Sequence, residues 1–148
     1  MTDPFLIPPE PTAADAIAAI ADELGSFDDW MDRYQFIIEM GRNLPPFPNE
    51  WADDAHRVPG CQSRVWMEPV LRDGKLYFAG ASDAVIVSGL VAMLLRVYSG
   101  RTPAEILATS PAFLTDLGLI QALSTNRGNG IAAMAQKLQE VAAKNRQV

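Results

Sequence analysis

The chain is organised around the stretch Val58-Pro59-Gly60-Cys61-Gln62-Ser63-Arg64-Val65-Trp66. Proline fixes its own φ and glycine tolerates unusual backbone angles, so Pro59 and Gly60 together predict a sharp turn. The β-branched and aromatic residues from Val65 onward predict a strand. Cys61, the only cysteine of the chain, is therefore expected at the tip of a loop or where a strand begins.

Two interpretations of Cys61 follow from the residues alone. Most free cysteines are small buried hydrophobic residues, and composition favours that interpretation. The polar neighbours Gln62 and Ser63 and the preceding turn favour a reactive thiol instead, because loops on a rigid scaffold often carry reactive groups.

Composition and charge narrow the class of protein. The 148 residues suit a single domain (1–148), and four prolines within residues 1–11 predict an extended N-terminal arm. A net charge of −6 without any run of Lys or Arg argues against nucleic acid and anionic membrane as partners. A single cysteine excludes an internal disulfide framework and a Cys-based zinc site, and it fits a reducing cytosol. The N-terminus lacks the pattern of a secretory signal, so a cytoplasmic protein is expected.

Hydrophobic periodicity predicts an α+β fold, with a small antiparallel sheet of about three strands packed against several helices. The predicted helices cover residues 13–24, 29–42, 83–98, 103–108, 111–118 and 130–144. The predicted strands cover residues 64–71 and 75–81, with a short third strand at 56–58. Asp73-Gly74 predicts a tight hairpin turn between the first two. The proline-rich residues 43–55 are expected to be irregular.

The predicted helix 83–98 is apolar on nearly every side. Such a helix is either buried at the centre of a fold or crosses a membrane. Sixteen residues that include Ser88 and Arg96 are too few and too polar to span a bilayer, so this is the predicted central core helix.

The cysteine stretch resembles the GCQSxVW signature of the SufE family, the sulfur-acceptor proteins that work with cysteine desulfurases. Three further blocks match that family in order, so the resemblance spans residues 28–138. They are Asp32-Arg33-Tyr34-Gln35-Phe36-Ile37-Ile38-Glu39-Met40-Gly41 with Leu44-Pro45, Ser82-Asp83-Ala84 with Ile86-Val87 and Gly89-Leu90, and Leu123-Ser124 with Arg127 and Asn129-Gly130. The resemblance implies a SufE/IscU-like fold.

The resemblance also implies a function. Cys61 would take persulfide sulfur from a SufS- or CsdA-like cysteine desulfurase, stimulate that enzyme and pass the sulfur to an iron–sulfur scaffold complex. The family is understood to shelter the loop tip in an apolar cavity and to release it on docking, here with Pro59-Gly60 as the natural pivot. No lysine lies in a pyridoxal phosphate motif, so the cofactor would belong to the partner. This chain would hold no cofactor or metal and would be a sulfurtransferase-type carrier without desulfurase activity of its own.

Six further residues are candidates for partner binding or for support of the loop: Gly60, Gln62, Ser63, Arg64, Asp83 and Arg127. Asp83 is expected to start the central helix beside the cysteine loop. Arg127 either serves the site or caps a helix. His56, Arg57 and Arg64 could favour the thiolate electrostatically, or could lie on a solvated loop edge.

An allosteric activator of a desulfurase, with a structural Cys61, is the alternative function. A cluster scaffold is a weaker candidate because one cysteine and one histidine offer too few ligands. Ser88 and Ser124-Thr125-Asn126-Arg127 depart from the family pattern, which leaves the cognate desulfurase open.

Overall fold

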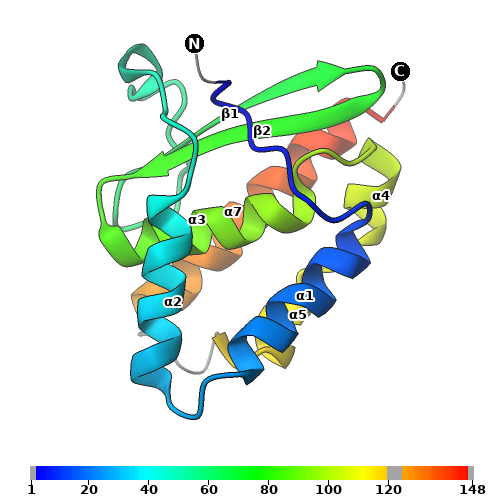
Figure 1. The fold of residues 1–148 in the computed structure, drawn as a ribbon. Helices are drawn as coiled ribbons and strands as arrows, with labels where there is room; N and C mark the ends of the chain where they lie inside the picture. The colour runs from blue at the N-terminus through cyan, green and yellow to red at the C-terminus, as the bar shows by residue number, and fades with distance from the viewer. Residues whose placement is uncertain (1–2, 120–124, 147–148) are drawn as a thin grey trace.

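The computed structural model describes residues 3–119 and 125–146, and for residues 125–128 it describes the backbone alone. The fold is α+β, with helices packed against a two-stranded antiparallel sheet (Figure 1). Its elements in chain order are α1 (Ala13–Gly25), α2 (Trp30–Arg42), the 3-10 turn η1 (Asn49–Trp51), β1 (Val65–Arg72), β2 (Lys75–Ser82), α3 (Val85–Tyr98), α4 (Pro103–Ala108), α5 (Phe113–Asp116) and α7 (Thr125–Lys144).

Side-chain caps start three helices within one residue of their predicted starts. Thr12 Oγ1 accepts the backbone N–H of Asp15 at 3.0 Å and starts α1. Asp29 starts α2 and Thr102 starts α4 in the same way, each accepting an N–H three residues further on. A capping side chain of this kind satisfies one of the N–H groups that a helix start leaves unpaired.

The hairpin turn is confirmed, but the predicted third strand is wrong. Asp73 (φ 52°) and Gly74 (φ 80°) both have positive φ, as a two-residue turn of this type requires. The segment 56–58 forms only an isolated bridge, between Arg57 and Trp66. The pairing ends on both sides at a turn: the N–H of His56 donates to Asp53 instead of β1, and Gly60, with φ of +87°, turns the chain away after Val58.

Three helices begin two or more residues from their predicted starts. Helix α5 covers only Phe113–Asp116 of the predicted 111–118, because a turn precedes it in which Ala112 donates its N–H to Ser110 Oγ at 3.2 Å. The central helix α3 begins at Val85 with Ala84 as its N-cap, so Asp83 does not start it. The last helix α7 begins at Thr125 rather than at Gly130. The composition of the stretch 125–129 favours a turn-rich loop, but tertiary context can override such local preferences.

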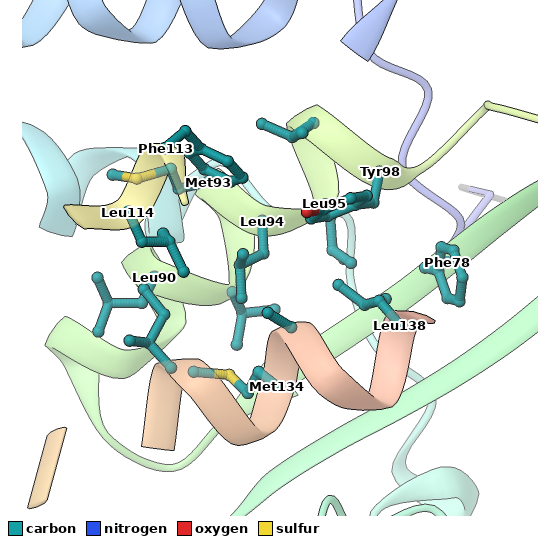
Figure 2. Packing of buried hydrophobic residues seen from close by; sticks show 14 of the residues in the cluster. Phe78, Leu90, Met93, Leu94, Leu95, Tyr98, Phe113, Leu114, Met134 and Leu138 are labelled. Carbon is teal, nitrogen blue, oxygen red and sulfur yellow. The ribbon is translucent and has the colours of Figure 1, made fainter. Parts of the chain in front are cut away.

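Helix α3 is the core of the molecule. Ten of its 14 residues are buried, and it packs against β2, α1, α2 and α7. Figure 2 shows its side chains between Met134 and Leu138 of α7 on one side and Phe113 and Leu114 of α5 on the other. Among the described residues, no helix combines the length and the apolar character that crossing a membrane requires.

The crossing of α2 and α3 brings two backbones into contact. A methyl carbon added at Gly89 would lie 2.1 Å from the carbonyl oxygen of Ile37, and one added at Gly41 would lie 2.6 Å from the backbone nitrogen of Gly89. Only glycine fits at such a distance. Ile37 is the one fully buried residue of α2, and the other large residues that share its apolar face, Trp30, Tyr34 and Ile38, are half-buried.

The N-terminal segment 3–11 runs alongside the sheet before α1 begins (Figure 1). The backbone N–H of Leu6 donates to the carbonyl of Phe78 in β2 at 3.0 Å. The half-buried Arg96 of α3 binds Glu10 and Glu23, each at 2.7 Å. These bonds attach the segment to β2 and α3, and Arg96 also joins α3 to α1.

We expect Gly89→Ala to lower the free energy of unfolding by about 3 kcal/mol, because the new methyl group would overlap the backbone of α2. Gly25→Ala is the matched control, since a methyl carbon added at Gly25 meets nothing within 4 Å. Urea unfolding followed by circular dichroism measures both variants. Equal stabilities would contradict the close crossing.

Candidate functional site

Hydrogen bonds between residues before and after the cysteine loop close its base. The buried Val58 donates its N–H to the carbonyl of Val65 at 2.8 Å. One step further out, Met67 donates to the carbonyl of His56 at 3.0 Å. Residues 59–64 therefore project as a short loop from the start of β1.

The end of β2 supports the same loop from the other side. The carbonyl of Arg64 accepts a hydrogen bond from Ser82 Oγ at 2.7 Å, and its N–H donates to Asp83 Oδ1 at 3.1 Å. Ser88 Oγ in turn donates to the carbonyl of Ser82 at 3.2 Å and ties this corner to α3. Asp83 thus holds the backbone of the loop instead of capping the helix.

The tip of the loop lies against α7. Gly60 has φ of +87°, a backbone conformation that favours glycine, and it turns the chain so that Cys61 points inward. Cys61 is half-buried against the hydrophobic core, and its Sγ donates a long hydrogen bond of 3.5 Å to the carbonyl of Gly130. The geometry brings together Gly60, Cys61 and Gly130, although Gly130 lies far from the other two in the sequence.

Burial further favours the protonated form of Cys61. It raises the pKa of the thiol above its ordinary value, because a charged thiolate loses solvation there. The positive charge of Arg57 acts in the opposite direction and lowers the pKa. Burial is the larger effect, so near neutral pH the thiol form predominates in this position.

His56 does not share the surroundings of the thiol. Its Nδ1 lies 2.6 Å from Asp53 Oδ1, its Nε2 lies 3.2 Å from Glu68 Oε2, and its ring stacks on Trp51. The carboxylate of Asp53, with a smaller contribution from Glu68, raises the pKa of His56. The imidazole therefore attaches the segment before the loop to β1, while of the three predicted cations only Arg57 favours the thiolate.

The predicted residues Gln62, Ser63 and Arg64 belong to the loop itself. Gln62 is exposed and Ser63 is half-buried. The guanidinium of Arg64 is 64% exposed and lies 4.0 Å from Asp83 Oδ2. The backbone of Arg127 belongs to the first turns of α7, but its side chain lies outside the described part of the structure.

Beside the loop lies an open cavity of about 230 Å³. It is lined by Ala52, Asp53, Asp54, Arg57, Arg64 and Trp66. Within residues 3–119 and 129–146, no group of three or more His, Cys, Asp or Glu side chains could hold a metal ion.

Sequence reasoning missed three functional contacts. They are the hydroxyl of Ser82, the carbonyl of Gly130 and the side chain of Ala133, whose Cβ would lie 3.2 Å from a methyl carbon added at Gly60. The signal for Gly130 was its residue type. A glycine has no side chain to cover its backbone, so another part of the chain can approach its carbonyl closely. Its contact with Cys61 joins residues 69 positions apart, which no local pattern reveals.

Comparisons with known proteins agree on one family. Residues 18–142 match the family model SufE, described as an Fe-S metabolism associated domain. An uncharacterised SufE-like protein of Rhizobium meliloti (strain 1021) is 38% identical over 128 residues, which cover 83% of this chain and 91% of that protein. The sulfur acceptor protein CsdE of Escherichia coli (strain K12) is 40% identical over 111 residues, which cover 74% of this chain and 76% of CsdE.

A solved structure shows the same fold. The solution structure of a hypothetical protein from Thermus thermophilus matches this chain with a TM-score of 0.74 at 21% identity. The match covers 97% of this chain and 100% of that one.

We expect Arg57→Ala to slow the alkylation of Cys61 by iodoacetamide near neutral pH. Removing the cation raises the pKa of the thiol further, so less thiolate is present at a given pH. The profile of alkylation rate against pH should reach the same maximum rate but should shift to higher pH. Lys144→Ala, at the exposed end of α7, is the control that should not shift. If the profile of Arg57→Ala matched that of the wild type, the result would contradict the role of Arg57.

We expect His56→Gln to destabilise the protein more in mildly acidic than in alkaline solution. The folded-state pKa of His56 is raised, so its ion pairs stabilise fully below the unfolded value of about 6.5 and weaken as pH rises through the folded value. Urea unfolding of both proteins over this range measures the difference. A difference that grows with pH would show that His56 is held in its neutral form.

Proposed function

This chain belongs to the SufE family, and from that premise we propose that it accepts sulfur onto Cys61 from the persulfide of a cysteine desulfurase. The family model associates the chain with iron–sulfur metabolism, and its relative CsdE is named a sulfur acceptor. The observation that carries the proposal is the position of Cys61, at the half-exposed tip of a loop whose base is fixed by hydrogen bonds.

The reaction is an exchange at sulfur. The thiolate of Cys61 attacks the terminal sulfur of a persulfide on the partner's cysteine. A new S–S bond forms at Cys61 while the S–S bond in the partner breaks, and the partner's cysteine leaves as a thiolate. Sulfur changes carrier without net oxidation or reduction, so no further reactant is needed.

The site provides both protection and access. The resting position buries the thiol and keeps it protonated, which suits a group that must not react with solutes at random. Attack requires the thiolate, and the charge of Arg57 favours its formation. The exposed side chains of Gln62 and Arg64 lie close to Cys61 in the sequence and offer a docking partner direct contacts.

The rest of the reaction sequence belongs to other proteins. The partner desulfurase supplies the pyridoxal phosphate chemistry that releases sulfur from L-cysteine, and this chain acts as an accessory carrier in the cytoplasm. Removal of sulfur from the desulfurase regenerates that enzyme, so its turnover should rise. An iron–sulfur scaffold complex is the next recipient.

Turnover of the desulfurase separates a carrier from an allosteric activator. The alanine that the desulfurase forms from L-cysteine is measured alone, with wild-type protein and with Cys61→Ser. We expect the wild type to stimulate turnover and Cys61→Ser to leave it at the basal rate, because the variant retains the fold but has no acceptor thiol.

A competition assay supplies the control for binding. Excess Cys61→Ser should suppress the stimulation by wild type, since it still occupies the docking surface. Stimulation that survives in Cys61→Ser alone would identify the protein as an allosteric activator and contradict the carrier function.

A further inference from the structure

We propose that Gly130 and Ala133 of α7 form a seat for the cysteine loop, and that the size of the side chain at position 133 controls how readily Cys61 is released to react. Ala133 is thus a positioning residue, acting on the thiol through Gly60. Its importance for sulfur transfer rests on the proposed function, whereas the seat itself can be tested without any partner.

The contacts of the loop tip define the seat. Gly130 is buried, and a methyl carbon added to it would lie 3.9 Å from Cys61 Sγ. One turn further along the helix, Ala133 lies so close that its Cβ would be 3.2 Å from a methyl carbon added at Gly60. Small residues at both positions let the helix approach the loop, and a longer side chain at 133 would meet the loop backbone.

The tip depends on α7 far more than the base does. In the part of the chain that the structure describes, residues 59–63 make one hydrogen bond to the rest of the molecule, from Cys61 to Gly130. A cavity of about 110 Å³ lies beside the seat, lined by Pro59, Ala133, Gln136, Lys137 and Glu140. The loop is therefore packed incompletely on this side and can separate from α7 while the bonds at its base stay intact.

The acceptor at the seat selects the protonated thiol. A carbonyl oxygen accepts a hydrogen bond from S–H, whereas a thiolate at the same place would face the negative end of the carbonyl dipole. The charged groups nearby are Arg57 on the loop side and Lys137 and Glu140 on α7. Leaving the seat thus exposes the sulfur and at the same time removes the group that opposes its deprotonation.

Ala133→Leu tests the seat, with Ala132→Leu as its matched control. Both substitutions add the same side chain to the same helix, but Ala132 is exposed. We expect Ala133→Leu to react with iodoacetamide about tenfold faster than wild type near neutral pH, because overpacking disfavours the closed position. Its alkylation profile should shift toward the ordinary pKa of a free thiol, about 8.5. Ala132→Leu should behave as the wild type does.

A second variant covers the case in which Ala133→Leu does not fold, which thermal melting would reveal. Ala133→Gly removes the methyl group on which Gly60 rests and adds no bulk, so its rate should lie between those of wild type and Ala133→Leu. Wild-type rates and pH profiles in the folded variants at 133, or an equal effect of Ala132→Leu, would overturn the seat.

Transfer from a desulfurase then distinguishes the two proposals. Faster alkylation and faster acceptance of persulfide sulfur by Ala133→Leu would support both. Faster alkylation in a protein that accepts no persulfide sulfur would leave the seat in place and contradict the proposed function.

Discussion

Burial of α3 on every side is the constraint on which the rest of the structure depends. Each fully buried Leu, Val or Met side chain stabilises the fold by about 1.5–3 kcal/mol, so the helix must be covered all round. β2, α1, α2 and α7 provide that cover, with α2 in backbone contact at Gly89. The cysteine loop lies where β1, β2 and α7 come together. It leads into β1, is hydrogen-bonded to the end of β2 and contacts α7.

The loop is fixed at one end and weakly held at the other, and this contrast links structure to function. Its base has several backbone and side-chain hydrogen bonds, so the position of Cys61 along the surface is well defined. Its tip has a long hydrogen bond to Gly130 and contacts with small side chains. Burial protects the thiol but raises its pKa, so the resting position favours protection over reactivity. A carrier of reactive sulfur needs both properties, at different moments.

The sequence predicted most features that depend on neighbouring residues. Capping side chains lie three positions from the N–H groups they accept, and the Asp73-Gly74 turn is contained in two residues, so both were predictable. The role of Cys61 is predicted by its motif. Features set by distant packing were not predictable: the contact of Cys61 with Gly130, the backbone crossing at Gly89 and the early start of α7 all join separate parts of the chain. The third strand failed because turns on both sides of residues 56–58, at Asp53 and at Gly60, end the pairing.

The most direct test of the central claim is the mass of the intact protein after incubation with a cysteine desulfurase, pyridoxal phosphate and L-cysteine, without reductant. The account predicts a gain of one or more sulfur atoms that peptide mapping locates on Cys61. The gain should disappear on treatment with a reductant and should be absent from Cys61→Ser. Stimulation of the desulfurase without any gain in mass would contradict the claim that this protein carries the sulfur.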